Sequence, residues 1–157
     1  MAEPRLMLTC GLPGAGKTVL ARRLAADRRA VQLTKDDWLW GLGATPWDEQ
    51  LGSRVEHQLW LLAERLLQIG QSVVLDFGLW ARAERDAFRT AARDLGAGVE
   101  LHYLDVAIDE LWSRVDARNA LPPWDRCPIG RDQLVEWFAA FEAPHADELA
   151  QFDPPPT

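Results

Sequence analysis

The sequence predicts a three-layer α/β fold, in which helices cover both faces of a mainly parallel sheet. Short runs of almost entirely apolar residues alternate along the chain with longer amphipathic stretches of helical period. The apolar runs do not alternate with polar residues, which is typical of strands buried on both faces. The chain has 157 residues, the size of one ordinary domain, so we treat residues 1–157 as a single domain.

The expected elements follow from these runs in chain order. Strands are predicted over residues 5–10, 30–34, 72–77 and 99–106, and helices over residues 17–28, 48–69, 82–95, 109–119 and 131–141. The longest helix, 48–69, carries leucines and a valine at spacings of three and four and stops at Gly70. Asp109 is expected to cap the helix that it begins. Residues 38–47 contain two glycines and a proline and are expected to form a loop or a broken helical turn, and the proline-rich residues 121–130 are expected to be irregular.

The charge balance limits the partners. The net charge is -7, and Lys17 and Lys35 are the only lysines. Binding to duplex nucleic acid requires many basic side chains that replace counterions. We therefore exclude a duplex reader, although a local basic groove for a short phosphorylated substrate stays compatible with the composition.

The chain shows no sign of secretion or membrane insertion. No stretch approaches 18 apolar residues, and the residues from Met1 to Arg5 are too few and too polar for a signal peptide. We expect a soluble cytoplasmic protein with no membrane partner. Cys10 ends an apolar run and is expected to be a buried free thiol, and Cys127 has no metal-binding spacing to it.

Eight tryptophans are unusual in so short a chain. Trp60 and Trp112 lie inside amphipathic helical patterns and are expected in the core. The others considered lie beside turns or predicted strand ends, where their rigid flat faces can form an apolar wall for a substrate: Trp38, Trp40, Trp47, Trp80 and Trp124.

A phosphate-binding motif follows the first predicted strand and opens the first predicted helix. The pattern G-x-x-x-x-G-K-[ST] is matched at every fixed position by Gly11, Leu12, Pro13, Gly14, Ala15, Gly16, Lys17 and Thr18. Glycines let backbone N–H groups turn toward phosphate oxygens, and the helix N-terminus adds partial positive charge. Lys17 is expected to reach the β- and γ-phosphates of a nucleotide, and the Thr18 hydroxyl to bind Mg²⁺.

Carboxylates follow the second and third predicted strands, at the edge where α/β sheets bind ligands. Asp36 or Asp37 is a candidate general base that accepts the proton of an acceptor hydroxyl; alternatively, either one caps the next helical turn. Asp76 ends the third strand and is predicted to hold Mg²⁺ through water or to bind substrate; a turn residue is the alternative.

Two arginines one helical turn apart precede the proline-rich segment. Arg114 and Arg118 share a helix face, and residues 114–131 are predicted to form a mobile lid. Arg118, with Arg114 second, is expected to stabilise the phosphoryl group in transfer, and Arg126 or Arg131 can substitute. The alternative is a solvated helix face with ion pairs to Glu110 and Asp116.

The chain resembles the small P-loop kinases that include polynucleotide kinase, chloramphenicol phosphotransferase and the zeta toxins. The resemblance rests on the phosphate loop (GLPGAGKT, 11–18), KDDW (35–38), VVLDFGLW (73–80) and the pair Arg114 and Arg118. It implies ATP as phosphate donor, Mg²⁺ as cofactor, Asp36 as the base, Arg118 as the lid arginine, and a sheet of five strands. Only Phe152 and Asp153 stand where the fifth strand is expected.

One departure from the group bears on the acceptor. Polynucleotide kinases commonly carry an arginine shortly after the aspartate pair, whereas this chain has Trp38, Leu39 and Trp40. The predicted acceptor is therefore a hydroxyl group of a neutral or partly apolar small molecule, such as an antibiotic or a metabolite. Asp37, Trp38, Asp76, Trp80 and Arg82 are the expected acceptor-binding residues.

Two other functions stay open at this point. Arg82 and Arg85 are compatible with an anionic acceptor, hence with a kinase of nucleic-acid ends or nucleotide sugars. A nucleotide-binding regulatory ATPase, in which Asp36 has no acceptor to activate, is the alternative outside the kinases.

Overall fold

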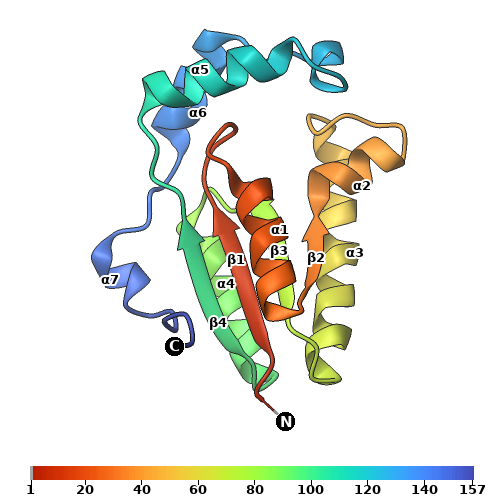
Figure 1. The fold of residues 1–157 in the computed structure, drawn as a ribbon, viewed down its shortest axis with the longest axis vertical. Coiled ribbons are helices and arrows are strands. Elements are labelled where there is room, and N and C mark those ends of the chain that lie inside the picture. Colours follow the sequence, from red (N-terminus) through yellow and green to blue (C-terminus); the bar gives the residue numbers. More distant parts are fainter. Residues whose placement is uncertain (1) are drawn as a thin grey trace.

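The computed structural model describes residues 2–157 and contains a parallel sheet of four strands. The strands are β1 (Arg5–Cys10), β2 (Val31–Thr34), β3 (Val73–Gly78) and β4 (Gly98–Tyr103). Their order in the sheet is β2-β3-β1-β4, and each neighbouring pair is parallel (Figure 1). The four predicted strands are confirmed: β1 has the predicted ends, and the ends of the other three differ from the prediction by at most three residues.

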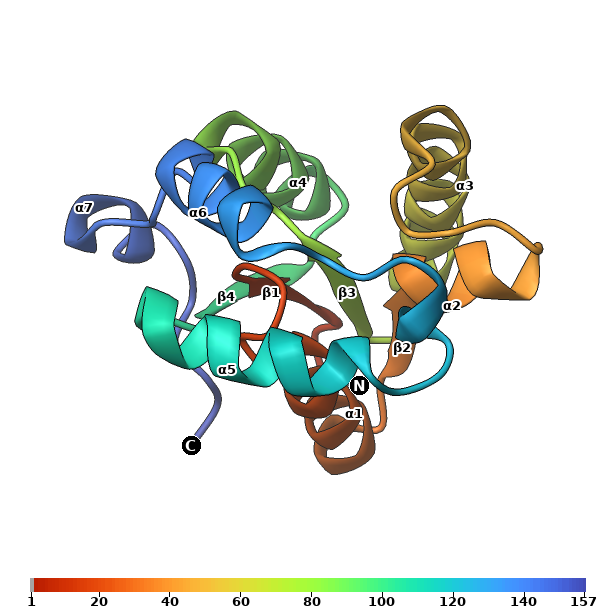
Figure 2. The ribbon, with the colours of Figure 1, turned by 90° about the horizontal axis from the view of Figure 1, so that it is seen from above.

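Helices cover the sheet on both faces, which confirms the three-layer α/β prediction. Helix α1 (Lys17–Arg28) packs on one face, and α3 (Glu49–Gln68) and α4 (Arg82–Asp94) pack on the other (Figure 2). Successive residues of β1 point to opposite faces, so Met7 joins the core under α1 while Leu6 and Leu8 join the core under α3 and α4. Both cores exclude water, as the all-apolar strand pattern predicts.

A third apolar cluster lies above the carboxyl ends of the strands. Helix α5 (Ile108–Asn119) and helix α6 (Arg131–Ala140) enclose it together with the loop that follows β1 (Figure 1). Leu111 and Val115 of α5 and Leu134 of α6 are buried there. Between these helices, a short 3₁₀ turn (Trp124–Arg126) lies within the segment that was predicted to be irregular.

Two local features differ from the sequence prediction, and a third agrees with one of its alternatives. Helix α2 (Lys35–Gly41) ends inside the segment 38–47, as expected for a helical turn that glycines and a proline interrupt. Asp109 does not cap α5; the helix begins one residue earlier, after Ala107, and Asp109 lies in its first turn. Helix α7 (Ala146–Leu149) is too short to show a helical period and was not predicted.

Other sequence predictions agree with the structure. The helix predicted over residues 48–69 is α3 (Glu49–Gln68), and Asp48 precedes it and accepts a hydrogen bond from the Leu51 amide at 2.9 Å. Cys10 is a buried free thiol. Trp60 and Trp112 are partly buried and pack against the core clusters. No helix among residues 2–157 has the length and apolar character needed to cross a membrane.

No fifth strand forms within the described residues. At the place where it was expected, Asp153 makes one backbone hydrogen bond to the Val99 carbonyl of the edge strand β4, at 2.7 Å. The Asp153 carboxylate accepts from the Val99 amide, also at 2.7 Å. The segment therefore covers the edge of the sheet at one residue without continuing it.

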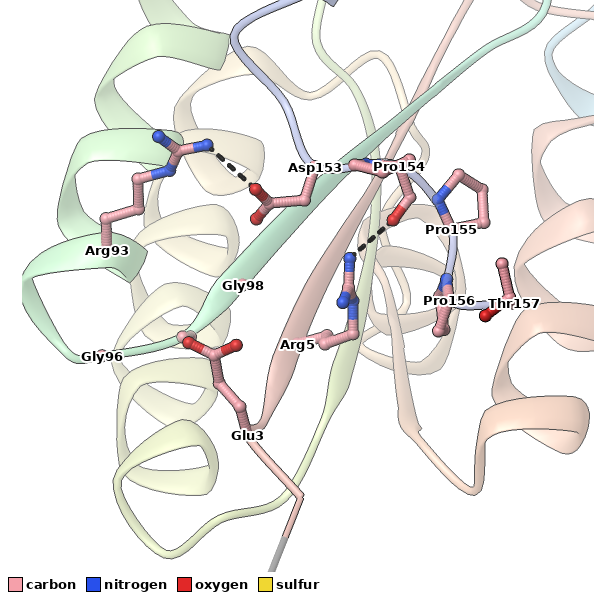
Figure 3. Close-up of a pocket in the computed structure, with 11 residues that line it drawn as sticks. Glu3, Arg5, Arg93, Gly96, Gly98, Asp153, Pro154, Pro155, Pro156 and Thr157 are labelled. Carbon is pink, nitrogen blue, oxygen red and sulfur yellow. Dashed lines mark hydrogen bonds and ion pairs between the residues drawn. The ribbon is translucent and has the colours of Figure 1, made fainter.

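A groove of about 600 Å³ lies beside this contact, at the amino ends of β1 and β4. Figure 3 shows its walls: Arg93 reaches Asp153 on one side, and Arg5 donates to the Pro154 carbonyl at 2.8 Å on the other. These contacts fasten the C-terminal residues to the sheet. The groove is at the opposite end of the strands from the phosphate-binding motif.

Candidate active site

A cavity of about 700 Å³ opens at the carboxyl ends of the strands. Its walls come from the phosphate loop, α2, the end of β3, α5 and the segment between α5 and α6. In Figure 2 that segment runs from α5 past α2 and back to α6, and its residues Pro123 and Trp124 line the cavity. The residues predicted to form the lid therefore border the cavity.

The phosphate loop has the conformation that its glycines allow. Gly14 and Gly16 have positive φ values of 86° and 94°, in the left-handed region that favours glycine. A Cβ atom on Gly14 would lie 3.0 Å from both the Leu111 carbonyl oxygen and a methyl carbon of Val115. The loop is thus packed directly beneath α5, with room for glycine only at this point.

Lys17 begins α1 and extends back over the loop. Its Nζ donates to the Leu12 carbonyl at 2.9 Å. Burial lowers the pKa of Lys17, and the nearby carboxylates of Asp76 and Asp36 act in the opposite direction. The arrangement holds the ammonium group at the cavity, on the phosphate-loop side.

Asp76 is buried at the base of the cavity and accepts hydrogen bonds from three threonines. Thr18 Oγ1 donates at 2.9 Å, Thr9 Oγ1 at 2.8 Å and Thr34 Oγ1 at 3.2 Å. A carboxylate joined to the hydroxyl of the phosphate-loop threonine is a hard-oxygen donor set that fits Mg²⁺. The hydrogen bond between Thr18 and Asp76 supports the predicted metal role of both residues. The sequence did not indicate that these two side chains are in contact.

Asp36 lies in the first turn of α2 and faces the cavity. Its pKa is raised above the ordinary range, chiefly because burial disfavours the charged form; Lys17 partly offsets this, and Asp76 adds to it. Asp37 is exposed and also lines the cavity. Thr34 is the residue before α2, so neither aspartate is its N-cap.

Trp38 does not line the cavity and is 46% exposed, which corrects the prediction that it contacts the acceptor. Each helical residue turns by about 100°, so Trp38 is directed away from the side that Asp36 occupies. Trp40 follows Asp36 by four residues, shares its face and lines the cavity.

Arg118 and Arg114 differ although they share a helix face. The Arg118 guanidinium lies 3.8 Å from the centre of the Trp124 ring. Within residues 2–157, its Nε and Nη2 are buried without a hydrogen-bond partner. Arg114 instead pairs with Glu110 at 2.6 Å and donates to the Gly14 carbonyl at 3.2 Å. Arg118 is therefore the arginine whose donors stay available to a ligand.

Arg82 and Arg85 are both held away from the cavity. Arg82 pairs with Asp147 at 3.0 Å on the surface. Arg85 is fully buried, and its Nε and Nη2 bind the two carboxylate oxygens of Glu148 at 2.6 and 3.0 Å. The prediction that Arg82 binds the acceptor is corrected, because its guanidinium joins α4 to α7 instead.

The phosphate loop and the surrounding fold agree with a known family. The family model described as an AAA domain matches residues 6–144. The chain belongs to this AAA domain family. Its match covers the sheet, the phosphate loop and the segment between α5 and α6.

Solved structures share the fold of this AAA domain at low sequence identity. A protein described as a candidate kinase from Chloroflexus aurantiacus is 23% identical, with a TM-score of 0.74 over 92% of this chain and 83% of that one. A gluconokinase from Sinorhizobium meliloti is 18% identical, with a TM-score of 0.63 over 94% and 80%. A chain of the Pnkp1/Rnl/Hen1 RNA repair complex is 17% identical, with a TM-score of 0.74 over 89% and 44%. These likenesses establish the P-loop fold.

The search of curated proteins found no match for this AAA domain. The family model, the fold and the phosphate loop thus place the chain in the family.

Sequence reasoning did not name Glu84, which lines the cavity, or Trp137, which contacts two of the tryptophans that line it. Trp137 belongs to α6. Its ring centre lies 5.1 Å from that of Trp47 and 5.7 Å from that of Trp80. Trp124 lies 5.5 Å from Trp40 and 6.2 Å from Trp47. These five tryptophans are far apart in the sequence, so no local pattern marked them as one cluster.

Proposed function

We propose that the chain is an ATP-dependent kinase that transfers the γ-phosphate to a hydroxyl group of a small molecule. The observation that carries this proposal is the placement of Asp36. A carboxylate with a raised pKa lies in the same cavity as Lys17 of the phosphate loop and the unpartnered donors of Arg118. A general base beside a phosphate-binding lysine and a free arginine is the set of groups that phosphoryl transfer to a hydroxyl requires.

In this proposal each group has one task. Asp36 accepts the proton of the acceptor hydroxyl and directs its oxygen toward the γ-phosphorus. Lys17 and the loop amides hold the phosphates, and Arg118 stabilises the charge of the phosphoryl group in transfer. Thr18 and Asp76 would hold Mg²⁺, which neutralises phosphate oxygens when bound.

The fold neighbours support a kinase in general terms. Those neighbours include the gluconokinase, an APS kinase from Mycobacterium tuberculosis in complex with AMPPNP and APS, and Chaetomium thermophilum Kti12 in complex with ADP-AlF3. Their names concern different acceptors or none, so the likeness supports ATP as the nucleotide and leaves the acceptor to this chain's own residues.

A kinase of nucleic-acid ends is the second candidate, favoured by the likeness to the RNA repair chain. The net charge of -7 disfavours a nucleic-acid acceptor. Arg82 and Arg85 also form ion pairs outside the cavity, so they do not offer positive charge to such an acceptor. Transfer from labelled ATP to oligonucleotides with 5′-hydroxyl ends would separate the two candidates.

The proposal is tested by screening a panel of antibiotics and metabolites for label transfer from γ-labelled ATP. With any acceptor found, Asp36→Asn should lower the transfer rate by roughly 10²–10⁴ and leave nucleotide binding unchanged. Asp116→Asn, an exposed aspartate of α5 outside the cavity, is the matched control. Transfer by Asp36→Asn within a few-fold of the parent protein would rule out Asp36 as the base. ATP turnover that no compound stimulates, and that Asp36→Asn leaves unchanged, would favour the regulatory ATPase.

A further inference from the structure

The basic and acidic residues that line the cavity without a salt bridge come from different elements. On the side of the phosphate loop, α1 and α5, the basic residues Lys17, Arg22 and Arg118 form no salt bridge within the described chain. Arg114, also on this side, is neutralised by Glu110. This side presents positive charge, which suits the phosphates of a nucleotide.

Helices α2 and α4 present free negative charge to the cavity. Asp36 and Asp37 of α2 and Glu84 of α4 line the cavity, and none of the three carboxylates pairs with a basic side chain in the part of the chain that the structure describes. Lys35 is the basic residue of α2 that lines the cavity, and Glu56 neutralises it at 3.0 Å. The acceptor half of the cavity therefore lacks a free cation to meet an anionic substrate.

Two of these carboxylates have no task in phosphoryl transfer as proposed. Asp36 takes the proton, whereas Asp37 is exposed at the cavity and Glu84 lies at the start of α4. Glu84 Oε2 accepts from the Ala81 amide at 3.1 Å, which leaves its other oxygen free. Asp76 is engaged elsewhere, by the threonines at the base of the cavity.

Tryptophans line the same half of the cavity. Trp40, Trp47 and Trp80 border it, and the indole of Trp47 is fixed by a hydrogen bond from its Nε1 to the Cys127 carbonyl at 3.2 Å. The negative face of an indole ring attracts a cation and also packs against apolar rings. Carboxylates and tryptophans together form a wall of the kind that recognises an ammonium group on a partly apolar molecule.

We propose that the phosphoryl acceptor carries a protonated amine as well as the reacting hydroxyl. Asp37 and Glu84 pair with the ammonium group, and the tryptophans pack against the carbon skeleton. This inference rests on the proposed kinase activity and narrows its acceptor class. It also gives a reason for the position of Arg82 and Arg85, since an arginine in this half would repel the substrate.

The transfer step conserves the ammonium group. The hydroxyl oxygen of the acceptor forms a bond to the γ-phosphorus of ATP as its proton passes to Asp36. The bond between the γ-phosphorus and the bridging β–γ oxygen breaks, and its electron pair leaves with ADP. Asp36 then releases the proton to solvent, and the amine stays protonated on the product.

Matched pairs of compounds test the inference. Kanamycin, glucosamine and phenylethanolamine are each compared with their N-acetylated forms, which keep the hydroxyls and lose the positive charge. Binding to the full chain is measured by calorimetry with a non-hydrolysable ATP analogue and Mg²⁺ present, and transfer is measured with γ-labelled ATP. At least one amine should bind about tenfold more tightly than its N-acetylated partner.

Variants then assign the effect to the two carboxylates. Asp37→Asn and Glu84→Gln should each weaken binding of the amine severalfold and leave the N-acetylated form unchanged. Glutamine at position 84 keeps the acceptor for the Ala81 amide, so α4 keeps its start. Asp116→Asn is the control variant and should leave both compounds unaffected.

Binding and transfer separate the inference from the kinase proposal. Selective binding of amines without label transfer would support the inference and contradict the kinase proposal. Label transfer to a neutral or anionic compound, with no preference for amines, would support the kinase and overturn the inference. Equal affinity for every amine and its N-acetylated partner, or selectivity that survives both substitutions, would also overturn it.

Discussion

The guanidinium group of Arg118 stacks on the indole of Trp124, with the guanidinium carbon 3.8 Å from the ring centre. The same indole lies edge-on to Trp40, whose ring centre is 5.5 Å away, on the helix that carries Asp36. Trp124 thus contacts both the free arginine and the helix of the proposed base. The position of Arg118 in the cavity depends on a ring that belongs to the segment between α5 and α6.

Removing this ring should impair transfer more than nucleotide binding. We expect Trp124→Leu to lower kcat by roughly 3- to 30-fold, the size of a desolvated cation–π contact, with little change in the KM for ATP. Trp124→Tyr keeps an aromatic face and should recover most of the rate. Trp60→Phe, at the contact between α3 and α4 and outside the cavity, serves as the control. An equal loss in the leucine and tyrosine variants would argue against stacking as the cause.

The phosphate loop should not tolerate a side chain at Gly14. Gly14→Ala places a methyl group against Leu111 and Val115 at a φ of 86°, so we expect a loss of about 1–3 kcal/mol in the free energy of unfolding and weaker nucleotide binding. Gly41→Ala is the matched control, because Gly41 lies in α2 with nothing within 4 Å of an added Cβ. That variant should be neutral or slightly stabilised. Denaturant titration and nucleotide titration measure both; equal stability of the two variants would contradict the packing of the loop under α5.

The buried pair of Arg85 and Glu148 should determine whether the C-terminal segment stays attached. Arg85→Met leaves Glu148 buried without its partner and is expected to cost about 3–5 kcal/mol in unfolding free energy. The double variant with Glu148→Leu removes both charges and should recover much of that loss. Arg82→Ala breaks an exposed pair with Asp147 and should cost less than about 1 kcal/mol. Urea unfolding at pH 7 compares the variants, and a double variant no better than Arg85→Met would speak against the ion pair.

The rate of transfer should fall on both sides of neutral pH. Burial raises the pKa of Asp36, so the carboxylate is protonated, and cannot act as a base, at a higher pH than an ordinary aspartate. Burial lowers the pKa of Lys17, so its positive charge is lost at a lower pH than for an ordinary lysine. A profile of kcat/KM against pH should show its acid limb above the usual aspartate range. If the residual activity of Asp36→Asn shows the same acid limb in kcat/KM, that limb belongs to a group other than Asp36.

Local patterns predicted much of the fold. Apolar runs gave the strands, and the repeat of leucines at spacings of three and four gave α3, because burial of one face dictates those periods. Errors arose where short-range signals are weak. Asp109 was expected to cap α5, although Ala107 precedes that helix, and the four residues of α7 carry no period at all.

The sequence alone determined the phosphate loop, since Gly11 to Thr18 are contiguous and their spacing fixes the backbone that they form. It also named Asp36, Asp76 and Arg118, each at the end of an element. Only the tertiary structure decided their neighbours: Thr18 against Asp76, Trp124 against Arg118, and Arg82 and Arg85 turned toward the C-terminal segment. The physical reason is that charge pairing and ring contacts depend on distance in space, whereas the sequence orders residues along the chain. The set of charges that lines the cavity without salt bridges is a product of that folding.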